Sequence, residues 1–592
     1  MENTISEKAK YWATSSAFDA DTRQEIKSLI DDNNEKELVE RFYKDLEFGT
    51  GGMRGILGAG TARMNIYNIR KATTALANYV NEFYAKEPER RVAISHDSRR
   101  YSREFAMAAA EVLAANGIKS YITKEMRPVP MLSFLTRFHK CHAGICVTAS
   151  HNPPEYNGFK VYWTTGGQLV PPHDKEIVSI YKSIEDYSSL KKTDYATALE
   201  KGQIVEVGEE FDNEYFNKVD TLNYRDTKSS DLKIVYTPLH GAGLFPVTET
   251  LKRNGFANVQ VVPEQEKPDG NFPTVSSPNP ENESAMLMAL ELGKKTNADL
   301  IIATDPDCDR IGMYIKEGDT YFRPNGNQIG CLLIDFVLSS LKETGKLPKA
   351  PLVIKTIVTT ELQDDIARDY GAKSLDTLTG FKWICQVIEE YETGVRKPYA
   401  QFVCGGEESY GFLADSFVRD KDGVISCFIA AQMVDYFKKQ NTTPTQVLRD
   451  LYKKHGAYFE NLYNLVLPGK DGADKIAAMM KNMREHPPKE IAGVPVDRLN
   501  DFENRAELTL THSGFEKTNT LELPPSNVLQ FYLMDGTKVS VRPSGTEPKI
   551  KFYISVKSGD AMGASDEQVD AVLEECKKRA NRIEEIFVAM AK

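Results

Sequence analysis

The chain has 592 residues, a length that predicts about four domains at roughly 150 residues each and excludes a single small binding module. Its 85 acidic residues outnumber its 74 basic residues, so the formal charge is −11, which argues against binding of nucleic acid through a broad basic surface. No apolar run could span a membrane, the first residues lack the apolar core of a signal peptide, and the eight cysteines show no C-x-x-C spacing. We therefore expect a cytoplasmic protein with reduced thiols that binds neither nucleic acid nor membranes.

A helical segment opens the chain. In residues 21–47, Leu38, Phe42 and Leu46 recur at helical spacing among charged residues, which predicts one or two amphipathic helices. Three repeats of alternating strands and helices follow, a βαβαβ pattern typical of a parallel sheet. The predicted strands are 92–95, 118–122 and 144–147, then 232–236, 259–262 and 300–304, then 352–358, 373–375 and 400–404. The helices between them are predicted at 103–115, 131–140, 245–254, 284–294, 360–369 and 382–391.

The pattern changes after about residue 455. Asp535-Gly536 lies between two β-prone runs, 529–534 and 538–541, and predicts a hairpin, while residues 566–590 predict a closing helix. The expected fold class is therefore α/β: three related domains with mixed, largely parallel sheets, followed by a C-terminal α+β domain. The expected domains are 1–205, 206–325, 326–455 and 456–592.

In each repeat a strand runs directly into a polar segment. These segments are TASHNP at 148–153, DPDCDR at 305–310 and GGEESYG at 405–411. Ligands of open α/β sheets bind at the carboxyl ends of the strands. We therefore expect the three segments to converge on one cleft.

The first segment offers a nucleophile. The Ser150 hydroxyl could attack if its proton is removed and the charge of the attacked group is offset, and His151 and Lys160 are candidates for these tasks. The competing interpretation is a turn at Asn152-Pro153 that Ser150 caps. The sequence contains no G-x-S-x-G, so a hydrolase nucleophile elbow is not indicated.

The second segment carries carboxylates at alternate positions. Asp305, Asp307 and Asp309 would project to one side of an extended segment and suit a hard divalent cation, with Mg²⁺ as the first choice. An EF-hand is excluded, because it would require glycine at Arg310 and an acid at Lys316. A solvated acidic turn is the alternative. Arg310 could hold a phosphate or form a structural ion pair.

The third segment could recognise a sugar. The carboxylate of Glu407 and the hydroxyl of Ser409 lie between glycines, and a carboxylate can accept hydrogen bonds from two vicinal hydroxyls. An ordinary glycine-rich turn is the alternative. Lys382 follows Thr379-Gly380 at the predicted start of a helix, where anions are stabilised.

Two further glycine-containing segments differ in what they predict. The tail residues Arg542, Ser544, Gly545 and Thr546 combine a guanidinium, two hydroxyls and accessible backbone, which suits a phosphate, although a surface turn has the same composition. GTGGMRG at 49–55 has Arg54 where a dinucleotide-binding motif requires its last glycine, so that interpretation is poor.

Together these motifs resemble the α-D-phosphohexomutase superfamily, in particular its phosphoglucomutase and phosphopentomutase branch. The resemblance extends over almost the whole chain in the family's order, and an ordered set is far more specific than a single loop. The motifs are GTGGMRG, SHDSR, TASHNPPEYNGFKVYW, TPLHGAG, SSPNPE, DPDCDR, TLTGFKWI, GGEESYG, RDKDG and RPSGTEPKIKFY. The resemblance implies four domains around a central cleft, with the last domain closing over a phosphosugar. We expect a monomer or a weak homodimer.

The resemblance also implies roles for the candidate residues. Ser150 would carry a phosphoryl group, and Mg²⁺ would be held by a phosphoserine oxygen together with Asp305, Asp307 and Asp309. Pro306 and Cys308 depart from the glycine-spaced metal loop common in the family, but the carboxylates are kept. The remaining roles would be Arg54, His151 and Lys160 at the reaction centre, Glu407 and Ser409 on sugar hydroxyls, Thr379, Gly380 and Lys382 at the far end of the substrate, and Arg542, Ser544, Gly545 and Thr546 on the non-transferring phosphate.

The expected reaction interconverts glucose 1-phosphate and glucose 6-phosphate through a phosphoserine and glucose 1,6-bisphosphate. Ribose 1-phosphate or deoxyribose 1-phosphate is an alternative substrate. A phosphohydrolase with Asp305 as nucleophile and a non-catalytic sugar-phosphate sensor are alternatives of other classes.

Overall fold

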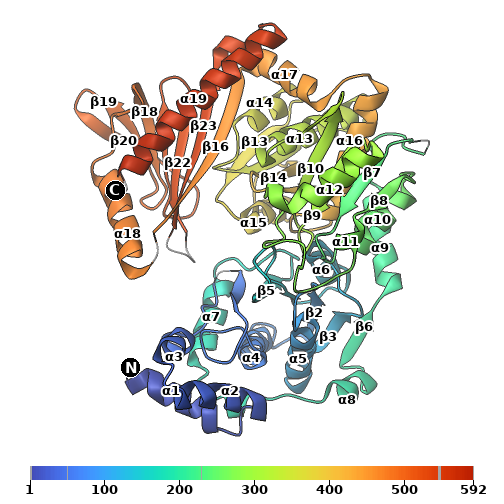
Figure 1. Ribbon diagram of the computed structural model, residues 1–592, viewed down its shortest axis with the longest axis vertical. Coiled ribbons are helices and arrows are strands. Elements are labelled where there is room, and N and C mark those ends of the chain that lie inside the picture. The colour runs from blue at the N-terminus through green and yellow to red at the C-terminus, as the bar shows by residue number, and fades with distance from the viewer. Residues whose placement is uncertain (1–2, 50, 229, 468, 545–548, 591–592) are drawn as a thin grey trace. The chain divides into compact units, whose positions relative to one another are not determined.

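The computed structural model describes residues 3–49, 51–228, 230–467, 469–544 and 549–590 (Figure 1). The chain divides into two compact units. The first comprises Met1–Gly326 and Phe381–Tyr436, and the second comprises Asn327–Gly380 and Phe437–Lys592.

Three helices precede the first sheet: α1 Asn3–Thr14, α2 Ala20–Asp31 and α3 Glu35–Phe42. α2 begins where the Asp19 carboxylate accepts a hydrogen bond from the Thr22 amide, which satisfies one free N–H of the first turn. The helices bury an aromatic cluster in which Trp12 stacks on Phe18 with ring centroids 4.2 Å apart. The structure thus adds α1 to the predicted segment, and Leu46 lies beyond α3, in the core of the first sheet.

The first sheet carries the predicted nucleophile. Its elements are β1 Gly52–Ile56, α4 Ile66–Phe83, β2 Arg91–His96, α5 Ser102–Ala115, β3 Lys119–Thr123, α6 Val129–Phe138, β4 Ala143–Val147, β5 Tyr156–Trp163, α7 His173–Ser183, η1 Tyr187–Ser189, α8 Tyr195–Glu200 and β6 Ile204–Val207. The strand order is β1-β5-β4-β2-β3-β6. β4, β2, β3 and β6 are parallel, whereas β5 is antiparallel to its two neighbours, β4 and β1. The predicted strands and helices of this repeat are confirmed, and β1, β5 and β6 are additional.

The direction of the connections places helices on both faces of this sheet. The connection β2-α5-β3 and the connection β3-α6-β4 run in opposite directions across the sheet. Since parallel crossovers are right-handed, α5 and α6 cover opposite faces. The carboxyl end of β4, from which residue 148 continues, is therefore an edge of a sheet that is covered on both sides.

The second sheet carries the predicted metal segment. Its elements are α9 Glu209–Asp220, β7 Ile234–Thr237, α10 Leu244–Arg253, β8 Val259–Val261, α11 Pro263–Glu266, α12 Glu283–Thr296, β9 Leu300–Thr304, β10 Ile311–Glu317 and β11 Thr320–Phe322. The order is β11-β10-β9-β7-β8, with β9, β7 and β8 parallel. β9 and β10 are antiparallel and are joined by the acidic loop, so the predicted elements of the second repeat are confirmed.

The third repeat contributes to both units. In the first unit, α15 Phe381–Glu392 precedes the antiparallel pair β14 Gln401–Glu407 and β15 Gly411–Ala414, and α16 Gly423–Lys439 follows. In the second unit, β12 Pro351–Thr356 and β13 Lys373–Thr377 are parallel and lie with α13 Gly326–Glu343 and α14 Leu362–Asp369. The strands and helices predicted for this repeat are present.

The C-terminal part of the second unit is an antiparallel sheet with helices. Its elements are α17 Pro444–His455, β16 Ala457–Val466, α18 Gly469–Glu485, β17 Glu490–Ile491, β18 Val494–Asp501, β19 Ala506–Thr511, β20 Gly514–Thr520, β21 Leu529–Leu533, β22 Lys538–Pro543, β23 Lys549–Ser558, η2 Gly559–Ala561 and α19 Asp566–Met590. The main path is β16-β23-β22-β21-β18-β19-β20. The hairpin predicted at Asp535-Gly536 joins β21 to β22, and the predicted closing helix is α19, whose Phe587 packs on Phe552 of β23.

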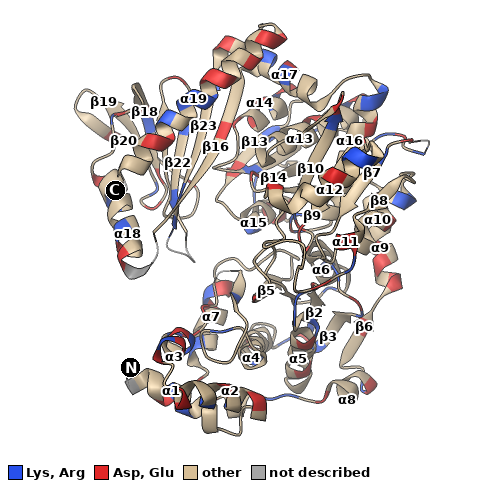
Figure 2. Cartoon of the chain, viewed as in Figure 1, with Lys and Arg blue, Asp and Glu red and all other residues tan. Residues whose placement is uncertain are grey.

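Acidic and basic residues both occur along α19 and the leading helices (Figure 2). Such mixed faces are typical of helix surfaces exposed to water. Over the described ranges, no helix combines the length and the apolar character needed to cross a membrane.

Candidate active site

Three segments at strand ends meet within the first unit. The Thr148 hydroxyl, just after β4, donates to Asp307 at 3.2 Å. The Ile311 amide, at the start of β10, donates to the carbonyl of Tyr410 in the turn after β14 at 3.0 Å. The carboxyl end of the first sheet is therefore connected to the acidic loop, and the acidic loop to the glycine-rich segment.

Ser150 lies in a constrained turn at the centre of this region. Its backbone has φ of +52°, in the left-handed region that non-glycine residues rarely adopt, and its amide donates to the Thr148 hydroxyl at 2.8 Å. The Ser150 hydroxyl donates to Asp305 Oδ2 at 2.9 Å, and its oxygen lies 3.1 Å from His151 Nδ1. The hydroxyl thus lies between a carboxylate and an imidazole, which is the arrangement that an activated serine requires.

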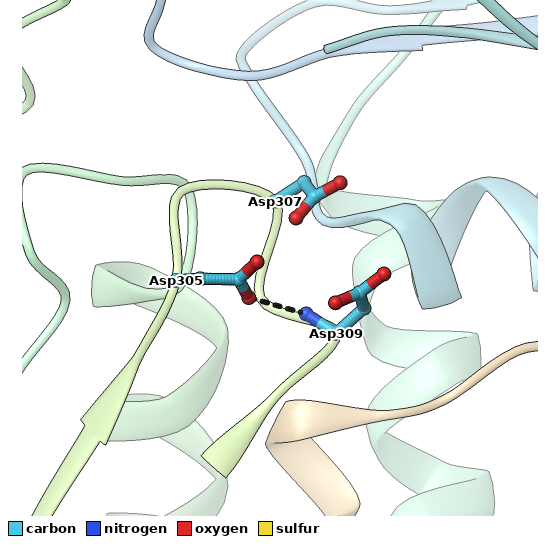
Figure 3. Close-up of side chains that lie close together, drawn as sticks. All are labelled: Asp305, Asp307 and Asp309. Carbon is cyan, nitrogen blue, oxygen red and sulfur yellow. Dashed lines mark hydrogen bonds between the residues drawn. The ribbon is translucent and has the colours of Figure 1, made fainter. Parts of the chain in front are cut away.

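The acidic loop between β9 and β10 gathers its three carboxylates (Figure 3). One oxygen of each of Asp305, Asp307 and Asp309 lies within 4.8 Å of the others, and all three residues are buried. Asp305 Oδ1 accepts from the Asp309 amide at 3.1 Å, the bond drawn in Figure 3, and from the Arg310 amide at 3.2 Å. Burial and the two neighbouring carboxylates raise the pKa of Asp305 well above its usual range.

The donor set fits a hard divalent cation. Asp307 Oδ1 and Asp309 Oδ1 are buried and accept no hydrogen bond from the described residues. Buried carboxylate oxygens without partners are costly unless a cation or a donor satisfies them. Three oxygen ligands of this kind are typical of sites for Mg²⁺ or Ca²⁺.

Four cationic side chains surround the carboxylates. Lys160 Nζ, from β5, donates to Asp307 at 2.7 Å, and Lys421 Nζ lies 3.3 Å from Asp309. Burial alone would raise the pKa of Asp309, but the positive charges of Lys421 and Lys160 outweigh burial and hold that pKa well below its usual range. The other two cations are Arg310, which pairs with Glu281, and Arg54 of β1, which donates to Asn152 at 3.0 Å. Positive side chains therefore gather around the three carboxylates although the chain as a whole is acidic.

His151 and Lys160 differ in their surroundings. Burial lowers the pKa of His151 well below its usual value, and the nearby Arg310 and Arg54 act in the same direction. Burial would also lower the pKa of Lys160, but Asp307 and Asp309 overcome it and raise that pKa. These shifts favour a neutral imidazole of His151 next to the serine and a charged ammonium of Lys160 next to the carboxylates.

The residues predicted to bind the sugar and the far end of the substrate lie in the third repeat, at the turn between β14 and β15 and at the start of α15. Glu407 ends β14, with a carboxylate oxygen 4.0 Å from Lys421 Nζ, and Ser409 lies in the turn that leads to β15. Lys382 is in the first turn of α15, its Nζ 5.0 Å from the centre of the Trp383 ring, and burial lowers its pKa. The two other residues predicted to bind the far end of the substrate are Thr379 and Gly380. Gly380 has φ of +109° and directly precedes α15.

The predicted phosphate cradle belongs to the second unit. Arg542 lies near the end of β22, and the Ser544 amide donates to the Lys549 carbonyl at 2.8 Å. Gly545 and Thr546 lie outside the described residues.

Comparison with known families decides the assignment. Four models of phosphoglucomutase/phosphomannomutase match in order: alpha/beta/alpha domain I at residues 45–188, domain II at 213–318, domain III at 325–455 and the C-terminal domain at 467–572. The chain belongs to the phosphoglucomutase/phosphomannomutase family. The predicted superfamily, the four-domain fold class and the prediction of a phosphosugar-mutase enzyme are thereby confirmed.

Relatives support this family assignment along the chain. The chain is 36% identical over 533 residues to a phosphoglucomutase of Staphylococcus saprophyticus, covering 90% of this chain and 94% of that protein. It is 36% identical over 539 residues to a phosphoglucomutase of Staphylococcus aureus strain MRSA252, with the same coverage.

Two solved structures share the fold of this family. Open-form pp63/parafusin from Paramecium has a TM-score of 0.64 at 16% identity and covers 91% of this chain and 96% of that one. A phosphoglucomutase/phosphomannomutase family protein from Burkholderia thailandensis has a TM-score of 0.58 at 20% identity, with 90% and 96% covered.

The RDKDG segment of this family member contributes side chains that the sequence did not assign. Asp420 accepts from the Tyr162 hydroxyl at 2.8 Å, Lys421 approaches Asp309, and Asp422 accepts from the Tyr215 hydroxyl at 2.7 Å. Consecutive residues therefore face the first sheet, the acidic loop and α9. The motif itself was the only signal in the sequence, because the partners lie far away along the chain.

Asp422 is expected to make the stability of the protein depend on pH. Burial raises its pKa to about 7, so the folded state retains a proton that the unfolded state releases, and unfolding becomes easier as pH rises from about 4 to about 8. One pKa unit is worth about 1.4 kcal/mol, so the free energy of unfolding should fall by up to about 4 kcal/mol through this group. Asp422→Asn should remove that decrease.

Urea unfolding of both proteins at pH 5 and pH 8 would measure it. We expect the difference in unfolding free energy between wild type and Asp422→Asn to change between the two pH values. An identical difference at both pH values would contradict the assignment.

Proposed function

We propose that the chain interconverts glucose 1-phosphate and glucose 6-phosphate through phospho-Ser150 and a glucose 1,6-bisphosphate intermediate. The observation that carries the proposal is the position of the Ser150 hydroxyl, 2.9 Å from Asp305 and 3.1 Å from His151 Nδ1, in a centre with three buried carboxylates. The identity to phosphoglucomutases over 90% of the chain supports glucose phosphates as substrates.

Asp305, Asp307 and Asp309 would hold Mg²⁺ together with an oxygen of phospho-Ser150. The buried oxygens of Asp307 and Asp309 that accept no hydrogen bond support this ligand set. When bound, Mg²⁺ would offset negative charge on the phosphoryl group during transfer. Lys160, Lys421 and Arg54 supply further positive charge around the same point, because phosphoserine itself carries about −1.5 to −2.

The reaction consists of two transfers through the same serine. In the first, the bond between phosphorus and Ser150 Oγ breaks while a bond forms to a free hydroxyl oxygen of the sugar monophosphate. The sugar bisphosphate then turns around in the site. In the second transfer, Ser150 Oγ takes the other phosphoryl group and the isomeric monophosphate leaves. Protons and charges balance, because one hydroxyl proton is lost and one is regained in each transfer.

Two side chains handle these protons in the proposal. His151 Nδ1 lies 3.1 Å from Ser150 Oγ, and its neutral imidazole accepts the hydroxyl proton as a phosphoryl group arrives. The imidazolium formed in this way returns the proton to the oxygen when the phosphoryl group leaves. Lys160, whose ammonium donates to Asp307 at 2.7 Å, is the candidate at the sugar oxygen. It can donate a proton to that oxygen when the phosphoryl group leaves it, and it can accept the hydroxyl proton only after giving one of its own to a neighbouring carboxylate.

The remaining contacts hold the two ends of the sugar phosphate. Glu407 and Ser409 would bind sugar hydroxyls, and Arg310 would exchange part of its pairing with Glu281 for phosphate. Lys382 is close to the N-terminus of α15, where an anion is stabilised. The residues proposed for the far end and the non-transferring phosphate are Thr379, Gly380, Arg542, Ser544, Gly545 and Thr546.

A substrate panel would test the proposal. With Mg²⁺ and glucose 1,6-bisphosphate present, kcat/KM for glucose 1-phosphate should exceed that for ribose 1-phosphate and deoxyribose 1-phosphate by about tenfold or more, because a site that holds both ends of a hexose misplaces a shorter sugar. Faster turnover of a pentose phosphate would favour the pentomutase alternative. Turnover of none of them would overturn the proposal.

A further inference from the structure

The backbone carbonyls of the serine loop are bound by side chains over five consecutive residues. The oxygens of residues 150, 152 and 153 accept from Arg99, that of His151 accepts from the Ser277 hydroxyl at 2.8 Å, and that of Pro154 accepts from Arg100 at 2.9 Å. Loops of folded proteins usually leave several such oxygens to water. Here the outer side of the loop is fixed by protein groups.

Arg99 supplies most of these contacts. Its Nη2 donates to the carbonyls of Ser150, at 2.6 Å, and Asn152, and its Nη1 donates to those of Pro153 and Tyr156, both at 2.9 Å. The four terminal N–H groups of the guanidinium are thereby used. A planar fork of donors can hold several oxygens in one geometry, which the point charge of lysine cannot do.

The guanidinium is itself held in place. Its side chain is buried, its Nε lies 3.4 Å from Asp97 Oδ2, and the Asp97 Oδ1 atom accepts from the Ser102 hydroxyl at 2.7 Å. The guanidinium carbon lies 4.9 Å from the centre of the ring of Phe272, which lies in the segment between α11 and α12. The ion pair and the aromatic contact therefore restrain Arg99 in addition to its hydrogen bonds with the serine loop.

We propose that Arg99 is the positioning residue of the phosphoryl-accepting serine. Through the carbonyls it holds the loop in the turn that gives Ser150 its φ of +52° and directs the hydroxyl toward Asp305 and His151. A left-handed serine costs roughly 1–2 kcal/mol in an unsupported chain, so the turn needs an external restraint. Ser277 is a second and weaker restraint of the same loop.

The test compares four variants. Arg99→Lys keeps the positive charge beside Asp97 but cannot bind four carbonyls. Asp97→Asn combined with Arg99→Met removes the pair without leaving a buried charge behind. Ser277→Ala removes one restraint. Arg103→Ala is the matched control, because this exposed arginine of α5 donates to the Lys124 carbonyl, outside the serine loop.

The first measurement is hydrogen exchange without substrate, so it stands whether or not the proposed function is correct. In Arg99→Lys and in the double variant, the amides of residues 150–152 and 155–158 should exchange at least about tenfold faster, while the amides of β9 keep their protection. Arg103→Ala should leave both regions unchanged. Equal loss of protection in the loop and in β9 would show a general stabilising role and overturn the proposal.

The second measurement is kinetic and rests on the proposed function. A misplaced nucleophile lowers kcat about 100-fold with KM within about threefold, since substrate contacts are retained. Ser277→Ala should lower kcat by less than Arg99→Lys does. If Arg99→Lys keeps the wild-type kcat and loop protection, pairing with Asp97 is all that Arg99 provides, and the proposal fails. If wild type turns over no phosphosugar while the loop responds as expected, only the proposed function fails.

Discussion

Ser150→Ala is expected to lower phosphoglucomutase activity by about 10⁴-fold or more, because it removes the oxygen that carries the phosphoryl group between the two transfers. Intact-mass analysis should show the mass of one phosphoryl group on wild type incubated with glucose 1,6-bisphosphate and none on the variant. The fold should be retained, since the side chain loses only its contacts with Asp305 and His151.

The control for this experiment is Ser188→Ala. Ser188 is exposed, and its hydroxyl binds Asp186. It should keep both the activity and the phosphorylation of wild type. Full mutase activity of Ser150→Ala would refute the phosphoserine mechanism, whereas phosphorylation at another residue would refute only the assignment of the nucleophile.

Asp305→Asn is expected to separate metal binding from folding. The variant loses one of three carboxylates that lie within 4.8 Å of one another, and it keeps an oxygen that can accept from the Asp309 and Arg310 amides. Activity should fall about 10³-fold, because the developing charge is no longer offset. In EDTA the variant should unfold at a temperature no lower than wild type, since relief of repulsion compensates for the altered contact with Ser150.

Thermal unfolding with and without Mg²⁺ provides the measurement. At about 100 times its dissociation constant, Mg²⁺ should stabilise wild type by about 2.7 kcal/mol and should give Asp305→Asn little stabilisation. The control Asp319→Asn, in the exposed turn between β10 and β11, should respond to Mg²⁺ as wild type does. Equal stabilisation of Asp305→Asn by Mg²⁺ would contradict the proposed ligand set.

The sequence predicted best what is encoded locally. The apolar run of β9 followed by carboxylates at alternate positions indicated both a strand and a cation site, and Asp535-Gly536 indicated its hairpin. β5 was not predicted because Asn157-Gly158, near its start, is typical of turns. The structure explains the glycine: a side chain at Gly158 would approach the Thr148 carbonyl to 2.3 Å, where β5 packs closely behind the serine loop.

Residues that act through distant contacts were the ones left unassigned. Arg99 and Lys421 stood in recognisable motifs, but their partners, the carbonyls after Ser150 and the carboxylate of Asp309, lie far away along the chain. Spacing along a sequence carries no information about such contacts, because they arise only when distant strands pair, as β2 and β4 do beside Arg99, or when separate sheets pack together. The polar strand β20 was missed for a related reason: most of its residues are exposed, so it lacks an apolar pattern.

The contact of Lys421 with Asp309 also bears on how the enzyme is synthesised. Translation produces Ser150 and Lys160 first, the three carboxylates next, and Lys421 well after them. Because domains fold largely in the order of their synthesis, a nascent chain that ends before residue 421 already contains the nucleophile and the carboxylates but not the second ammonium that faces Asp309. The complete catalytic centre therefore cannot form on the ribosome until the third repeat is almost finished.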